Sequence, residues 1–189
     1  LAVYSLKSYC EEKGHIEGIE LFETTINNRL EDILNEIYER RPDIAAFSCY
    51  IWNIEYVYRL IPELRKLLPG IHIWLGGPEV SYSPDKVLKK LPQAELVMCG
   101  EGEETFLSLC RIYNLWQDSK KEEEFKEALS QDIEGIAYRR GNREFIKTGD
   151  RKPADLSSIP FPYKDIDNLE NRIIYYESSR GCPFSCSYC

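Results

Sequence analysis

The 189-residue sequence predicts an α/β fold in which a parallel sheet carries helices on both faces. Three features of the chain lead to this prediction. Short apolar runs alternate with longer segments whose apolar residues recur at helical spacing. Three of these runs end in loops rich in glycine or small polar residues, as strands of such a sheet do. The strand–helix units are short and regular, which favours parallel strands joined by helical crossovers.

The first elements are expected before Pro42. Apolar residues at helical spacing predict a helix over residues 1–13, which a glycine then ends. Residues 16–24 alternate between apolar and polar, as a half-buried strand does. Asn27 or Asn28 could cap a second helix, whose apolar residues again recur at helical spacing and which Pro42 closes.

The following elements continue the alternation. Residues 43–50 form an apolar run that predicts a buried strand, and residues 54–68 predict a third helix. Residues 71–75 are another apolar strand. The remaining expected elements are a short helix over 84–91, a strand over 95–99 and a helix over 103–116.

The chain changes character after Trp116. A charge run over residues 118–127 predicts a solvated helix face or loop, and residues 135–147 predict a β-hairpin that turns at Gly141-Asn142. A proline-rich linker and a last strand over residues 173–177 follow. We therefore divide the chain into an α/β unit over 1–116, a connecting segment over 117–165 and the start of a further unit over 166–189.

The composition bounds the function classes. With 24 basic and 32 acidic residues the net charge is −8, which argues against nonspecific binding to nucleic acid or to anionic membranes. No apolar run approaches the length of a membrane span. Four of the seven cysteines lie in apolar patterns and are expected to be buried free thiols, which favours a reducing cytoplasm. These four are Cys10, Cys49, Cys99 and Cys110.

The remaining three cysteines, Cys182, Cys186 and Cys189, have the spacing CxxxCxxC. Three thiolates on one short loop can hold one metal centre, and three ligands on a four-iron, four-sulfur (4Fe-4S) cluster leave one iron open. Half of a zinc knuckle or a redox trio is the alternative. Zinc prefers four closed ligands, and the only histidines, His15 and His72, are far away in sequence.

Residues 179–189, SRGCPFSCSYC, resemble the cysteine motif of radical S-adenosylmethionine (radical SAM) enzymes. The resemblance implies a 4Fe-4S cluster on the three cysteines, with S-adenosylmethionine chelating the fourth iron. One electron from the cluster then cleaves S-adenosylmethionine to a 5′-deoxyadenosyl radical. Tyr188 would lie beside the adenine, and a reductant such as ferredoxin or flavodoxin would be the redox partner.

Three loops are expected at the carboxyl ends of the predicted strands, where open parallel sheets bind ligands. They are residues 48–53, 76–81 and 100–105. Glycines there let a ligand approach the backbone, although a Gly-Gly pair after a strand is often only a tight turn. The dinucleotide fingerprint GxGxxG is absent, because Gly100-Glu-Gly102 lacks its third glycine.

Taken together, FSCYIWN (47–53), LGGPEVS (75–81) and GEGEETF (100–106) resemble the cobalamin-binding domain of cobalamin-dependent radical SAM enzymes. The resemblance covers most of residues 1–113, resumes at about residue 133, and implies a flavodoxin-like (Rossmann-type) fold. Tyr50 and Trp52 would lie against the corrin, with ordinary packing as the alternative. The other cofactor-binding residues that it implies are Ser48, Gly76, Gly77, Gly100 and Glu101.

The sequence departs from that family at both ends. The family fold opens with a strand and a loop before the first helix, whereas Leu1 lies inside the expected helix. Residues 166–189 would begin a radical SAM barrel that is otherwise missing, so this fragment is expected to be inactive. Loss of the first strand would expose unpaired sheet edges, which predicts pairing with another chain or with an N-terminal piece.

We therefore expect part of a cobalamin-dependent radical SAM enzyme. Its reaction would be methyl transfer or a radical rearrangement on a small-molecule or otherwise unknown substrate. Two alternatives stay open. The α/β unit could be a recognition or scaffold module without cobalamin, or the chain could be a structural zinc protein.

Overall fold

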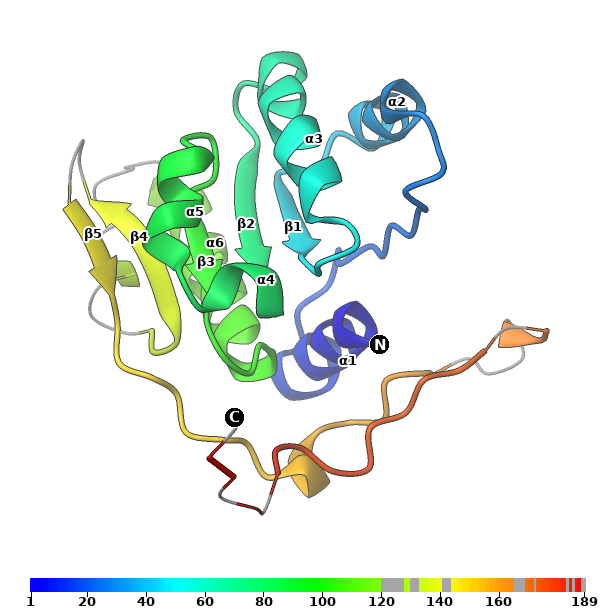
Figure 1. The fold of residues 1–189 in the computed structure, drawn as a ribbon, viewed down its shortest axis with the longest axis vertical. Coiled ribbons are helices and arrows are strands. Elements are labelled where there is room, and N and C mark those ends of the chain that lie inside the picture. Colours follow the sequence, from blue (N-terminus) through cyan, green and yellow to red (C-terminus); the bar gives the residue numbers. More distant parts are fainter. Residues whose placement is uncertain are drawn as a thin grey trace.

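The computed structural model describes residues 1–119, 128–129, 133–140, 144–164, 169–171, 173–182, 184 and 186–187. They contain one five-stranded sheet with the order β1-β2-β3-β4-β5 (Figure 1). The strands are β1 (Ile44–Ser48), β2 (His72–Gly76), β3 (Leu96–Met98), β4 (Ile136–Arg140) and β5 (Glu144–Lys147).

The sheet is mixed. β1, β2 and β3 are parallel, as the sequence predicts. They are neighbours in this order, with Ala46 opposite Trp74 and Trp74 opposite Leu96. β4 pairs antiparallel with β3, and β5 pairs antiparallel with β4. The predicted hairpin is therefore present and extends the parallel sheet; its turn at Gly141-Asn142 lies outside the described residues.

Helices cover both faces of the sheet. Buried residues of α2, α3 and α5 form one core, and those of α1 and α6 form the other. In Figure 1, α3 and α5 lie in front of the sheet and α6 lies behind it. The α-helices are α1 (Ala2–Gly14), α2 (Leu30–Arg40), α3 (Ile54–Leu67), α4 (Pro78–Ser81), α5 (Pro84–Lys90) and α6 (Glu103–Ser119), and a 3-10 helix η1 (Leu156–Ser158) follows the hairpin. The flavodoxin-like α/β prediction is confirmed.

The alternation of side chains along each strand divides the two cores. Ile73 and Leu75 of β2 belong to the core beneath α2, α3 and α5, whereas Trp74 between them belongs to the core beneath α1 and α6. All three side chains are fully buried. Burial of one such side chain contributes roughly 1.5–3 kcal/mol, so this strand alone ties both helix layers to the sheet.

The prediction of a strand over residues 16–24 is wrong, because this segment pairs with no described strand. Its apolar residues are real anchors, but they serve two different cores. Ile16 and Ile19 pack against the α1–α6 core, and Phe22 packs against the core of α2 and α3. The apolar residues of this segment therefore alternate with polar ones because the chain passes from one face of the sheet to the other.

The strand predicted over residues 173–177 is also absent. These residues run as an unpaired segment, in which Ile173, Tyr175 and Tyr176 are largely exposed. The hydroxyl of Tyr163 donates to the backbone carbonyl of Tyr175 at 2.7 Å, which fixes part of the segment. An apolar run forms a strand only where a neighbouring strand can receive its hydrogen bonds.

Two smaller predictions also need correction. The N-cap of α2 is Arg29, which makes no side-chain capping bond; Asn28 instead donates its side-chain amide to Thr24. β1 is only partly buried, because it is the edge strand of the sheet. Within the part of the chain that the structure describes, no helix combines the length and apolar character that crossing a membrane requires.

Candidate functional site

One large groove lies at the carboxyl ends of the parallel strands. Because β1, β2 and β3 run the same way, the loops that follow Ser48, Gly76 and Met98 meet at one edge of the sheet. The groove has a volume of about 2110 Å³ and is lined by all three loops, by α1 and by the segment that leads to Gly181. In Figure 1 the chain after β5 passes below these strand ends, on the side of α1.

Asn53 holds the loop after β1 in shape. Its side-chain oxygen accepts the backbone N–H of Tyr50 at 2.8 Å, and its side-chain amide donates to the carbonyl of Ser48 at 2.9 Å. The rings of Tyr50 and Trp52 then stack, with centroids 4.6 Å apart and an angle of 7° between the planes. Trp52 remains 65% exposed, so this stack presents an aromatic surface at the groove instead of filling the core.

The two predicted glycine loops differ in how much space they leave. Gly77 has a φ of +105°, and a Cβ there would lie 2.5 Å from the carbonyl oxygen of Cys49. This glycine is therefore required by the packing of the β2 loop against the β1 loop. Gly100 has a φ of +80°, and a Cβ there would have no neighbour within 4 Å. Of these two glycines, only Gly100 has a backbone that opens onto free space in the groove.

Glu101, one of the predicted cofactor-binding residues, is engaged by the protein itself. Its Oε2 accepts the backbone N–H of Ala154 at 2.8 Å and lies 3.4 Å from Nη1 of Arg180. These contacts bring residues that follow the hairpin onto the loop after β3. The role of Glu101 as a cofactor contact stays a prediction.

Glu103 at the start of α6 is a buried charge that the sequence analysis missed. Ser5 donates to its Oε1 at 2.8 Å, and Arg180 pairs with both of its oxygens. Burial opposes its ionisation, but the hydrogen bonds from Arg180 and Ser5 outweigh burial, so the pKa of Glu103 lies below its usual value. The hydrogen bond with Glu103 raises the pKa of Arg180 in turn.

The sequence contained one signal for this contact. Arg180 and Gly181 immediately precede the first cysteine of the motif, and Glu101 and Glu103 belong to the GEGEETF segment. The partners are 77 residues apart in sequence, and only the fold brings them together.

The metal-ligand prediction can be followed for two of the three cysteines. Cys182 and Cys186 are exposed free thiols, whereas Cys189 and Tyr188 lie outside the described residues. Exposed thiols suit an iron–sulfur cluster, which thiolates hold. Among the described residues, no group of three or more metal-binding side chains occurs. These residues include Cys182 and Cys186 but not Cys189, so the complete set of three cysteines is not covered by this finding.

The other four cysteines are buried free thiols, as expected from their apolar surroundings. Burial raises the pKa of the Cys49 thiol to about 12, and burial also raises the pKa of Cys99. A hydrogen bond with Cys110 raises the pKa of Cys10. The thiols of Cys10, Cys49 and Cys99, whose pKa values are raised, are therefore protonated at neutral pH and are poor nucleophiles or metal ligands.

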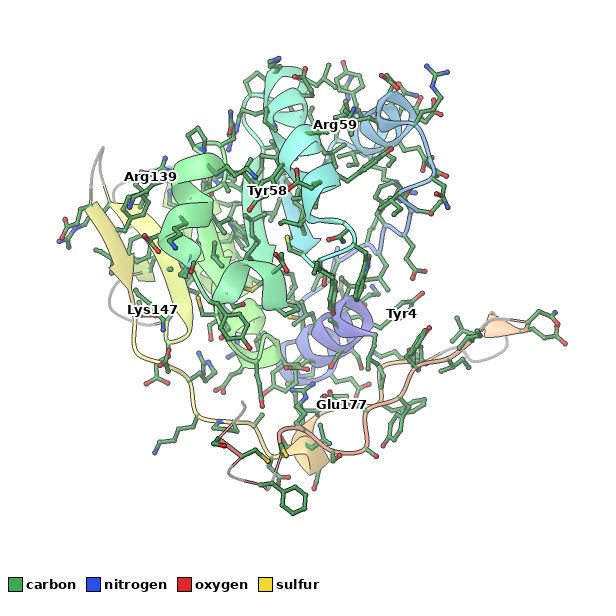
Figure 2. All side chains as sticks on the ribbon, in the orientation of Figure 1. Tyr4, Tyr58, Arg59, Arg139, Lys147 and Glu177 are labelled. Carbon is green, nitrogen blue, oxygen red and sulfur yellow. The ribbon has the colours of Figure 1, made fainter. Side chains whose placement is uncertain are left out.

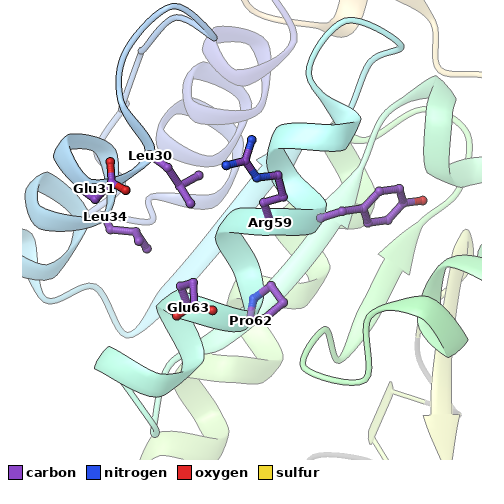
Figure 3. A pocket seen from close by; sticks show the side chains of 7 residues that line it. Leu30, Glu31, Leu34, Arg59, Pro62 and Glu63 are labelled. Carbon is purple, nitrogen blue, oxygen red and sulfur yellow. The ribbon is translucent and has the colours of Figure 1, made fainter.

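A second hollow, of about 540 Å³, lies between α2 and α3 (Figure 3). Leu30, Arg59 and Glu63 are among the residues that line it. It is formed by helix side chains away from the strand ends, and none of the predicted site residues contributes to it. The groove at the sheet edge is therefore the candidate site.

The sheet, its two helix layers and the groove at its carboxyl edge define a ligand-binding α/β domain of the flavodoxin-like class. The chain belongs to the B12 binding domain family, which matches residues 1–109.

The relatives of this chain include methyltransferases and cyclases. The chain is similar to the cobalamin-dependent radical SAM methyltransferase TokK of Streptomyces tokunonensis, with 25% identity over 97% of this chain and 27% of TokK. It is also similar to the anaerobic magnesium-protoporphyrin IX monomethyl ester cyclase of Cereibacter sphaeroides, with 26% identity over 84% of this chain and 26% of the cyclase. The chain thus spans about a quarter of the length of these two relatives.

A solved structure shares the fold. The cobalamin-dependent S-adenosylmethionine radical enzyme OxsB superposes on 88% of this chain with a TM-score of 0.66 and 20% sequence identity, over 22% of its own length. The family match and the similarity to TokK confirm the resemblance to cobalamin-dependent radical SAM enzymes, and the shared fold agrees with it.

Proposed function

We propose that this chain is part of a cobalamin-dependent radical SAM enzyme and that the groove at the carboxyl edge of β1, β2 and β3 holds cobalamin. The observation that carries the proposal is the continuity of the groove. It begins at the predicted cobalamin loops and reaches Gly181, the residue immediately before Cys182. Both cofactors would then meet on one side of the sheet.

The residues around the groove fit the parts of a cobalamin molecule. The open backbone at Gly100 suits close approach of the nucleotide tail, and the exposed stack of Tyr50 and Trp52 suits the flat corrin. The tail contacts would come from Ser48, Gly76, Gly77 and Gly100, and Glu101 would be a further cofactor-binding residue. When bound, cobalamin supplies a methyl group or assists a radical rearrangement.

The cysteine motif would supply the second centre. Cys182, Cys186 and Cys189 would hold a 4Fe-4S cluster, and Tyr188 would lie beside the adenine of S-adenosylmethionine. When bound, a cluster of this kind supplies the electron that cleaves S-adenosylmethionine. The partners would be a small-molecule or otherwise unknown substrate and a reductant such as ferredoxin or flavodoxin. An oxygen-sensitive cluster favours the cytoplasm.

Cobalamin binding is tested by incubating the protein, at its full natural length, with hydroxocobalamin and measuring the corrin that is retained after desalting. Trp52→Ala should lower the retained fraction several-fold without lowering stability, because Trp52 is largely exposed. Tyr38→Ala is the matched control, since Tyr38 is an exposed aromatic residue on α2 that does not line the groove. If wild type retains no corrin, the α/β domain is a recognition or scaffold module.

The cluster is tested by anaerobic reconstitution and absorption spectroscopy. The triple replacement of Cys182, Cys186 and Cys189 by alanine should abolish the iron–sulfur absorption. Cys99→Ala should leave the iron–sulfur absorption intact, because Cys99 is a buried thiol immediately after β3 and is not part of the cysteine motif. Zinc in place of iron, or a cluster retained by the triple variant, would refute the assignment.

A further inference from the structure

Arg180 links the cysteine motif to the rigid part of the domain. Its guanidinium reaches three carboxylates from two separate stretches of the chain. Nε lies 2.7 Å from Oε2 of Glu177, Nη1 lies 3.0 Å from Oε2 of Glu103 and 3.4 Å from Oε2 of Glu101, and Nη2 pairs with Oε1 of Glu103. The side chain is only 20% exposed. Figure 2 shows Glu177 beside α1, at the foot of the sheet.

Glu103 anchors this linkage in the core. Its side chain is 6% exposed, and it stands at the first position of α6, whose inner face packs on the sheet with α1. Ser5 of α1 donates to its Oε1, so the carboxylate also joins the two helices. A carboxylate held in this way has little freedom to move.

The geometry requires an arginine. The guanidinium engages both oxygens of Glu103 with two nitrogens, while Nε is left for Glu177. A lysine side chain has a single nitrogen and could not bond both oxygens of Glu103 and Glu177 in this geometry. Loss of the partner would leave Glu103 buried with Ser5 as its remaining side-chain donor, so the contact resists opening.

We propose that Arg180 is a positioning residue, which through Glu103 holds the segment leading into Cys182 against the carboxyl edge of the sheet. The benefit of this contact rests on the proposed function. If the cysteines hold a cluster and the groove holds cobalamin, a fixed cysteine segment keeps the cluster at one defined position facing the groove. Arg180 itself contacts neither cofactor in this proposal. Its role is to prevent the cysteine segment from moving independently of α1, α6 and the loop after β3.

Hydrogen exchange tests the contact without any cofactor. In the protein at its full natural length, Glu103→Gln should accelerate amide exchange over residues 173–182 by about tenfold or more, which corresponds to opening of the contact. Exchange in β2 should not change. Glu104→Gln is the matched control, because Glu104 is the next residue of α6 and pairs with Arg151 instead, at 2.9 Å. Equal exchange over residues 173–182 in wild type and Glu103→Gln would overturn the proposal.

Two milder variants cover the case in which Glu103→Gln fails to fold. Arg180→Lys keeps the positive charge but cannot bond both oxygens of Glu103 through two nitrogens. Ser5→Ala removes one hydrogen-bond donor to Glu103. Both should accelerate exchange over residues 173–182, by less than Glu103→Gln does where that variant folds. If neither changes exchange in this segment, the positioning role is refuted.

A spectroscopic measurement tests the purpose of the contact. In protein that carries cob(II)alamin and a reduced cluster, pulsed electron paramagnetic resonance gives the distribution of distances between the two centres. That distribution should be narrow in wild type and broad in Arg180→Lys at equal cofactor content; an unchanged distribution would overturn the proposal. If wild type binds neither cofactor, the proposed function fails, whereas the exchange experiment still decides whether Arg180 holds the segment.

Discussion

Gly77 and Gly100 both have positive φ values, yet only one of them is crowded. A Cβ at Gly77 would meet the carbonyl oxygen of Cys49 at 2.5 Å and its backbone nitrogen at 2.9 Å, whereas one at Gly100 would meet nothing within 4 Å. A backbone atom cannot move aside as the end of a side chain can. The first glycine therefore serves packing, and the second serves the open groove.

We expect Gly77→Ala to be much more destabilising than Gly100→Ala. A positive φ alone costs an alanine about 1–3 kcal/mol, which both variants incur. Gly77→Ala adds an overpacking cost of about 1–3 kcal/mol at the Cys49 backbone. Urea unfolding measures the difference, and equal midpoints for the two variants would show that the loops do not pack as closely as described.

Glu103 makes stability depend on pH. Its pKa is lower in the folded state than in the unfolded state, so its contribution is complete above the usual pKa of a glutamate and is lost as the pH falls through the lower folded value. At neutral pH, Glu103→Gln should cost about 1.5–3 kcal/mol, the range for hydrogen bonds to charged groups. Unfolding free energies of wild type and variant, measured from about pH 7 to about pH 3, should converge at the acidic end. A difference that is constant over this range would contradict the shifted pKa.

At the level of single residues, the sequence alone can single out a candidate site residue only where one local pattern is sufficient. The cysteine spacing and the glycines after the strands were visible without a fold. The contact between Arg180 and Glu103 was not predicted, because its partners lie 77 positions apart and meet only after the chain has passed back below the sheet. Neither residue has a distinctive sequence environment apart from its neighbours in the two motifs.

At the level of elements, periodicity predicted helices better than strands. A helix satisfies its own backbone, so the apolar spacing of residues 54–68 was enough to predict α3 nearly to its ends. A strand needs a neighbour. Residues 16–24 and 173–177 have apolar patterns typical of strands, but no described strand pairs with them. Pattern alone cannot show whether a partner is available.

The β4–β5 hairpin should unfold together with the parallel strands, because β4 is hydrogen-bonded to β3. Ile136 of β4 is fully buried in the α1–α6 core, and its replacement by alanine should cost about 2–5 kcal/mol of the unfolding free energy. Ile146 of β5 is only partly buried against the same core, so Ile146→Ala should cost less. Calorimetry should give one transition for wild type and for both variants. A separate early transition in Ile136→Ala would show that the hairpin is an independent unit.

At the level of the whole molecule, the sheet has an open side. β1 pairs with β2 alone among the described strands. The carbonyl of Asp43 and the amide of Cys49 bond toward β2, so the intervening residues 44, 46 and 48 point their backbone groups the other way. The candidate groove extends along this edge, between β1 and residues 16–26. The parallel direction of β1 to β3 was predicted from the sequence, but whether this edge is paired depends on which chain lies beside it.

We propose that in the isolated 189-residue chain this edge pairs with β1 of a second copy, because exposed strand edges are templates for association. Ala46→Pro should weaken the association, since proline removes the outward N–H of an edge strand and leaves the bonds to β2 in place. Ala46→Val keeps the N–H and a strand-forming side chain, so this control should associate as wild type does. Sedimentation over a range of concentrations measures the dissociation constant. Equal association of the proline and valine variants, or a monomeric wild type, would exclude pairing through β1 and leave the edge to be covered in another way.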